Sequence, residues 1–162
     1  MQKITPFLWF DQQAEEATKF YVSLFKNSKI LDVVRYGDEG PKVTGRAKAS
    51  VMTVRFRLDG HEFTALNGGP VFKFNEAVSL VINCRNQAEV DRLWTKLSRG
   101  GSQGQCGWLK DKYGLSWQIV PAALFELFTA KDPVKKQRVM NAMLKMRKLD
   151  IKKLQQAAAA KG

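Results

Sequence analysis

Residues 50–67 read SVMTVRFRLDGHEFTALN. Apolar and polar side chains alternate along Ser50–Leu58 and again along Glu62–Asn67, and a period of two predicts strands with one face against a core. Asp59 and Gly60 separate the two segments and are typical of a two-residue hairpin turn. We therefore expect an antiparallel β-hairpin here.

The turn also sets the expected register of this hairpin. Two turn residues place Arg57 opposite Glu62 and Arg55 opposite Thr64. Both pairs share one face of the hairpin, and the phenylalanine of each strand lies on the other face. One face is thus predicted to be polar and charged, and the other apolar.

Two amphipathic helices are predicted on either side of the hairpin. The apolar stripe of the first consists of Ala14, Ala17, Phe20, Tyr21, Leu24 and Phe25, and that of the second of Val90, Leu93, Trp94 and Leu97. Asn86 and Glu89 have the spacing of a capping box at the start of the second helix, and Gly100 is a stop signal at its end. Each helix is expected to cover one face of a sheet.

A weak internal repeat links the two helices. Gln13–Glu15 recurs as Gln87–Glu89, and the same offset of 74 residues maps Thr5 onto Ser79. Each helix follows a short apolar strand and precedes three strand-like segments, of which the first in the second half lies around Gln105. The order predicts an α+β fold of two β-α-β-β-β units, at about residues 1–70 and 71–121. Their remaining faces are expected to enclose a cavity, the natural ligand site.

The last part of the chain differs in charge from the rest. Ten basic and two acidic residues lie from Lys131 to the end, which accounts for +8 of the net charge of +12. Asp132 with Pro133, and later Asp150, are helix-start signals. We expect a domain of residues 1–130 and a basic helical extension of residues 131–162. Docking on nucleic acid or another polyanion is the alternative function, but no aromatic residue follows Phe128 to stack on bases.

Location and thiol chemistry follow from two simple patterns. The apolar run Ile4–Phe10 is interrupted by Pro6 and stops at Asp11, so it is neither a signal peptide nor a membrane span. Cys84 and Cys106 are too few and too far apart for a redox motif, and reduced thiols are expected. The sequence therefore favours a cytoplasmic protein without a membrane partner.

Three segments resemble a known family: Pro6–Tyr21, Leu66–Pro70 and Gln105–Pro121. They are similar to PhnB-like proteins of the vicinal-oxygen-chelate (glyoxalase/bleomycin-resistance) superfamily, a group of unknown function labelled 3-demethylubiquinone-9 3-methyltransferase. The tail around Val139–Ile151 resembles that group's C-terminal helical extension. The resemblance implies a glyoxalase-like fold and a homodimer.

The resemblance also implies where a metal would bind, because related enzymes hold a divalent ion with His and Glu on the first and last strands of each unit. Counting four residues from the glycine of each turn gives Thr64 and Gln118, and the repeat gives Ser79 and Thr5. Hydroxyls and an amide are poor ligands for zinc, nickel or manganese. We expect no metal, and neither metal-dependent glyoxalase nor dioxygenase chemistry. His61, the single histidine, is interpreted as a surface turn residue.

The methyltransferase label is not favoured either. Gly101, Gly104 and Gly107 resemble a glycine-rich cofactor loop, but they follow a helix and lead into strands, which is the reverse of the order that such a loop requires. No cofactor is expected. Cys106 is interpreted as a small half-buried residue at the start of a strand, not as a reactive thiol.

The sequence thus predicts a metal-independent protein that binds or turns over a small molecule in its cavity. Whether it is an enzyme, which residues are catalytic and which ligand it takes stay open. The predicted pocket consists of Thr5, Phe7, Arg55, Thr64, Ser79, Trp108 and Gln118.

Overall fold

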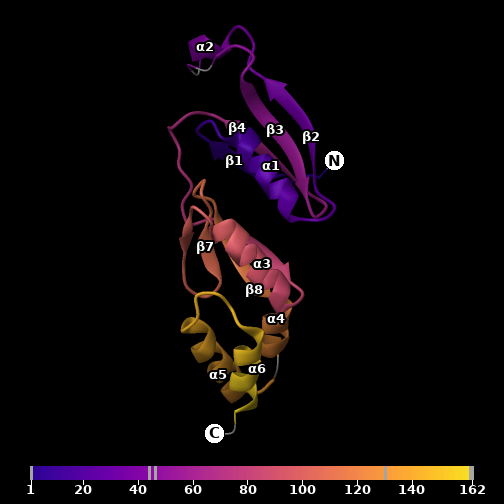
Figure 1. Cartoon of the computed structure of the whole chain (residues 1–162), viewed down its shortest axis with the longest axis vertical. Coiled ribbons are helices and arrows are strands. Elements are labelled where there is room, and N and C mark those ends of the chain that lie inside the picture. Colours follow the sequence, from indigo (N-terminus) through magenta and orange to yellow (C-terminus); the bar gives the residue numbers. More distant parts are fainter. Residues whose placement is uncertain (1, 44, 46, 130, 161–162) are drawn as a thin grey trace. The chain divides into compact units, whose positions relative to one another are not determined.

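The computed structural model describes residues 2–43, 45, 47–129 and 131–160. It divides into two compact units, Met1–Phe74 and Asn75–Gly162, and each unit has its own four-stranded sheet (Figure 1).

The first unit contains β1 (Phe7–Phe10), α1 (Ala14–Leu24), β2 (Lys29–Arg35), α2 (Gly40–Val43), β3 (Val51–Leu58) and β4 (His61–Asn67). Its strands lie in the order β1-β4-β3-β2, with β1 parallel to β4 and the other pairs antiparallel. The predicted hairpin register is confirmed, because Arg55 pairs with Thr64 and Arg57 with Glu62. Both turn residues have positive φ, 44° at Asp59 and 87° at Gly60, as the primed hairpin turns require.

α1 covers one face of the first sheet. Its Ala14, Ala17 and Tyr21 are fully buried, and so are Val54 and Ala65 on the strands beneath. The helix begins without a cap from its own Gln13. Asn67, at the end of β4, takes that role, because its Oδ1 accepts a hydrogen bond from the Ala14 backbone N–H at 2.8 Å.

The second unit begins with β5 (Leu80–Cys84), α3 (Gln87–Ser98), β6 (Ser102–Gln103), β7 (Trp108–Lys110) and β8 (Ser116–Pro121). Its order β5-β8-β7-β6 repeats that of the first sheet. Phe7 pairs with Thr64 in the first sheet and Val81 pairs with Gln118 in the second. Phe7 and Val81 are 74 residues apart, so the offset derived from the sequence is confirmed.

One strand prediction was wrong by a few residues. The first strand after α3 is Ser102–Gln103 and does not lie around Gln105. Residues 104–107 instead form a tight turn, in which the Gly104 N–H donates to the Trp108 carbonyl at 2.8 Å and the Trp108 N–H donates to the Gln105 carbonyl at 2.9 Å. The glycines that favour a turn outweigh the weak strand signal.

The chain ends in α4 (Ala122–Thr129), α5 (Pro133–Leu144) and α6 (Ile151–Ala159), which belong to the second unit. The predicted caps are confirmed, since the side chains of Asp132 and Asp150 accept backbone N–H bonds at the starts of α5 and α6. The three helices share a small core consisting of Val120, Leu124, Val139, Leu149, Leu154 and Ala158.

Hydrogen bonds fasten this helical segment to the rest of the second unit. The backbone N–H groups of Cys106 and Gly107 donate to the carbonyls of Met146 and Arg147, both at 2.7 Å. The Gln87 side chain, at the start of α3, accepts from the Ile151 N–H at 2.9 Å and donates to the Leu149 carbonyl at 3.1 Å. The segment is therefore packed against the second sheet and its helix.

In the described part of the chain, the helices are all too short or too polar to cross a lipid bilayer. Both cysteines are free, as predicted.

The two thiols should differ in reactivity. Cys84 is fully buried, and burial, followed by the nearby Glu89 charge, raises its pKa to about 12. The thiolate is the reactive form, so at pH 8 iodoacetamide should leave Cys84 unmodified in the native protein and label the half-buried Cys106. Mass spectrometry of the tryptic peptides measures both. In concentrated urea the two should label alike, and preferential native labelling of Cys84 would contradict its burial.

Candidate functional site

A row of side chains crosses the face of the first sheet that lies opposite α1. Arg55 on β3 pairs with Thr64 on β4, which pairs with Phe7 on β1. Paired residues point to the same face, and the buried Val54 and Ala65 point to α1. Phe7 is 60% exposed and Thr64 is half-buried. Three predicted pocket residues are thus neighbours, and Thr5 is an exposed residue two positions before Phe7.

The charges beside this row form a small network. Glu62 accepts a hydrogen bond from Arg57 Nη2 at 2.9 Å, and its other oxygen lies 3.6 Å from Arg55 Nη2. The hydrogen bond from Arg57 lowers the pKa of Glu62, and the charges of Arg57 and Arg55 add to this. The carboxylate therefore stays ionised, and two guanidinium groups share it.

The corresponding face of the second sheet, opposite α3, is mostly neutral. Trp108 on β7 pairs with Gln118 on β8, and Gln118 Nε2 donates a hydrogen bond to Ser79 Oγ at 2.9 Å. Three more predicted pocket residues therefore lie together. The Ser79–Gln118 bond joins one position given by the repeat to one given by the glycine spacing.

Ser116, which shares this face, is a residue that the sequence reasoning missed. Its side chain is 1% exposed, and its Oγ has no hydrogen-bond partner in the described part of the chain. It lines a cavity of about 100 Å³ together with Trp108 and the Lys110–Glu76 ion pair. The residues around Ser116 in the sequence do not indicate that it is buried, because its burial results only from the packing of the folded unit.

The side chains present do not fit the metal site of related enzymes. Ser79 and Gln118, which would be ligands, hydrogen bond to each other, and Thr64 offers one hydroxyl. Neutral oxygen donors without a carboxylate or imidazole bind transition metals weakly. Among the described residues there is no cluster of three His, Cys, Asp or Glu that could hold an ion. His61 begins β4 at the hairpin turn and is exposed, in agreement with its interpretation as a turn residue.

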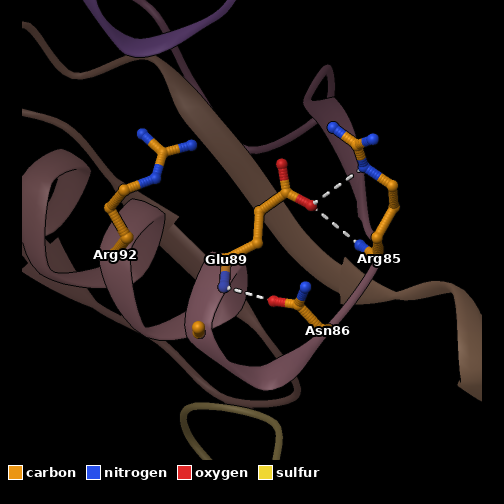
Figure 2. Close-up of a pocket in the computed structure, with 5 residues that line it drawn as sticks. Arg85, Asn86, Glu89 and Arg92 are labelled. Atoms are coloured by element: carbon orange, nitrogen blue, oxygen red, sulfur yellow. Dashed lines mark hydrogen bonds and ion pairs between the residues drawn. The ribbon is translucent and has the colours of Figure 1, made fainter.

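A hollow of about 340 Å³ lies at the start of α3 (Figure 2). Its polar atoms cap the helix: Asn86 Oδ1 accepts from the Glu89 N–H at 3.0 Å, and Glu89 Oε2 accepts from the Arg85 N–H at 2.8 Å. The predicted cap at Asn86 is confirmed, whereas Glu89 reaches back to the N–H of Arg85, one residue before the position that a strict capping box would use. Because these groups serve the helix end, the hollow is a surface feature of the cap.

A larger hollow, of about 540 Å³, lies in the first unit beside the start of α1 and the beginning of β3. Arg35 is one of its lining residues and donates a hydrogen bond to the Ala49 carbonyl at 2.9 Å. Asn67, also in the lining, is buried and bonded to Ala14 and Val51. Both polar groups hold the backbone of the unit together.

Local backbone geometry explains why glycine occurs in the segment that resembles a cofactor loop. A Cβ at Gly101 would lie 2.1 Å from the Lys110 carbonyl oxygen. Gly107 has φ of 84°, and a Cβ there would lie 2.8 Å from the Ile119 carbonyl oxygen. Gly104 and Gly107 lead into β7, not into a helix. The backbone approaches so closely at Gly101 and Gly107 that only glycine fits there.

Comparison with known proteins agrees with this architecture. The chain is similar in structure to the PhnB protein from Bacillus cereus, with 38% sequence identity and a TM-score of 0.68 over 75% of this chain and 100% of that one. It is also similar in fold to the protein PA1353 from Pseudomonas aeruginosa, with 21% identity and a TM-score of 0.60 over 75% of this chain and 98% of that one. Among curated proteins, none is similar enough to count as a match.

The sequence itself matches a family description over most of its length. Residues 2–120 match the family described as 3-demethylubiquinone-9 3-methyltransferase, and the match ends just before α4. The chain, with its two β-α-β-β-β units, therefore belongs to this PhnB-like family of glyoxalase-like fold.

Proposed function

We propose that the protein binds a small organic molecule on the faces of its sheets opposite α1 and α3, and that it does so without a metal ion. The Ser79–Gln118 hydrogen bond at 2.9 Å carries the proposal. It joins the two positions at which the resemblance to metal-dependent enzymes predicts ligands, and the two neutral side chains satisfy each other. The same pair is suited to orient a polar group of a ligand beside Trp108.

Transfer of a methyl group, which the family description names, is not part of the proposal. Two of the glycines that resemble a cofactor loop, Gly101 and Gly107, are required because the backbone approaches itself closely there. No cofactor is therefore proposed. A cytoplasmic location, predicted from the sequence, belongs to the same proposal.

Polyanion docking by the C-terminal helices is not proposed as a second function. Arg138 donates to the Ala157 and Ala158 carbonyls, and Lys148 forms an ion pair with Asp91. Val139 and Leu154 belong to a buried core. These contacts support a structural role for the segment.

A metabolite library tests the proposal by thermal shift in buffer that contains a chelator. A ligand at a hundred times its Kd stabilises the native state by about 2.7 kcal/mol, which raises the melting temperature by several degrees. Gln118→Ala should abolish the shift for ligands of the second sheet, and Gln155→Ala, an exposed position on α6, should leave it unchanged. A library without any stabilising compound, or hits that need added metal, would contradict the proposal.

The purified protein is predicted to hold no stoichiometric transition metal. Neutral hydroxyl and amide donors do not compensate for the loss of a divalent ion's water shell. Elemental analysis after dialysis against a mild chelator should find far less than one metal per chain. One zinc or nickel per chain that survives Ser79→Ala and Gln118→Ala would place the ligands elsewhere. Loss of a tightly held metal in either variant would show that these neutral side chains do bind it.

We also propose a homodimer, which is the usual assembly of relatives with this fold. Exposed apolar side chains such as Val81 and Leu144, at 48% and 57% exposure, support an interface between copies. Light scattering at micromolar concentration should return twice the monomer mass of 18.3 kDa. A mass equal to the monomer would contradict the dimer.

A further inference from the structure

The face of the first sheet opposite α1 carries an excess of positive charge. Among its described residues are the cations Lys29, Arg55 and Arg57 and the carboxylates Asp32 and Glu62, all placed there by the strand register. The difference is one positive charge. Glu62 stays ionised because the hydrogen bond from Arg57 lowers its pKa, so the excess persists at neutral pH.

Arg55 is the more exposed of the two arginines beside Glu62 and the one that the carboxylate holds less tightly. Arg57 holds the short contact with Glu62, at 2.9 Å, whereas Arg55 lies 3.6 Å from the same carboxylate, beyond hydrogen-bond distance. The Arg55 side chain is 46% exposed, against 33% for Arg57. The contact of Arg55 with Glu62 is a long one that helps to lower the pKa of that carboxylate, and a single such contact does not occupy all five N–H groups of a guanidinium.

The neighbours of Arg55 determine which class of ligand its guanidinium would bind. Thr64, directly opposite on β4, offers a hydroxyl, and Phe7, the next residue across on β1, offers a ring that is 60% exposed. Adjacent strands are about 4.8 Å apart, so the row from Arg55 to Phe7 spans roughly 10 Å. A guanidinium and a hydroxyl beside an exposed ring match an anionic head with an apolar body.

We propose that this row binds the carboxylate of a small organic acid at Arg55 and Thr64, with the apolar body of the acid against Phe7. The inference rests on the proposed function and names its ligand class. A single negative charge matches the excess of one positive charge on this face, whereas a phosphate ester would bring nearly two.

Benzoate and benzamide are suitable probes, because they share a shape and differ in charge. The full-length protein is titrated with each and followed by amide NMR shifts, including that of Thr64. Benzoate should bind and shift Thr64, and benzamide should bind at least about tenfold more weakly, since charge-assisted hydrogen bonds are the stronger ones. Phenyl phosphate binding without benzoate binding would overturn the carboxylate assignment.

Single substitutions test whether benzoate binds at the row from Arg55 to Phe7. Arg55→Gln should weaken benzoate binding by about tenfold or more, and Arg99→Gln, which removes the same charge at an exposed position after α3, should change it by less than about twofold. Phe7→Ala should weaken benzoate but not acetate. Each variant is first shown to be folded by its amide spectrum.

The outcomes separate this inference from the proposed function. If neutral library compounds bind the sheet faces and benzoate binding is insensitive to Arg55→Gln, the acid site is wrong and the small-molecule function stands. If no compound of any charge shifts residues of either face, both fail.

Discussion

Replacing Asp111 by alanine is expected to destabilise the second unit by about 3–5 kcal/mol, because it leaves several buried donors without a partner. Asp111 is 2% exposed. Its Oδ1 accepts from the backbone N–H groups of Tyr113 and Leu115 at 2.9 and 3.1 Å, and its Oδ2 accepts from Trp117 Nε1 at 2.8 Å. One carboxylate thus holds the turn between β7 and β8 and the largest fully buried side chain.

Urea unfolding followed by tryptophan fluorescence measures this effect. Asp111→Asn should lose less than the alanine variant, because it keeps one oxygen for the two backbone donors but turns an NH₂ group toward the Trp117 indole. Asp38→Ala is the matched control, since its side chain is 83% exposed, and it should stay within about 0.5 kcal/mol of the wild type. An equally small change in Asp111→Ala would show that the turn does not depend on the carboxylate.

Leu154→Ala is expected to destabilise the second unit by about 2–5 kcal/mol. Leu154 is fully buried in the core shared by α4, α5 and α6, beside Leu149 and Val139. Removing three carbon atoms from this small cluster leaves a cavity, and few neighbours are available to fill it. The neighbouring Lys153 is exposed, so Lys153→Ala is the matched control and should have little effect.

The buried core around Leu154 also affects how the result of a C-terminal truncation is interpreted. Deleting residues 131–162 removes Val139, Leu149 and Leu154 and uncovers Val120 and Leu124. It also breaks the backbone bonds at Cys106 and Gly107. The truncated chain should therefore melt at a lower temperature than the full chain, and any lost binding to a polyanion would not by itself assign that binding to the tail. A truncated chain with unchanged melting would contradict the packing role.

Local sequence patterns were sufficient for much of the first unit. The alternation along β3 and β4 and the Asp59–Gly60 turn predicted the register that the structure has, because a two-residue turn allows only one pairing. In the second unit the caps at Asn86, Asp132 and Asp150 also formed as predicted, since caps depend on residues within one turn of helix.

The repeat extended this success to the second unit. The repeat alignment gave Ser79 and, by the same offset of 74 residues, Thr5, and Ser79 is joined to Gln118 by a hydrogen bond. The assignment of these side chains to a ligand site stays a prediction. The weak strand around Gln105 failed, because the tight turn at residues 104–107 depends on contacts with Trp108 that no periodicity reveals.

Contacts between distant segments could come only from the tertiary structure. Asn67 caps a helix that begins 53 residues earlier, and Gln87 holds a backbone more than 60 residues later. Ser116 loses its exposure, and Arg55 lies farther from Glu62 than Arg57 does, because of what packs beside each of them. Helix period, strand alternation and turn chemistry act over a few residues, so they specify elements and register. Burial and side-chain partners depend on which elements meet in space, and that depends on the packing of the whole unit.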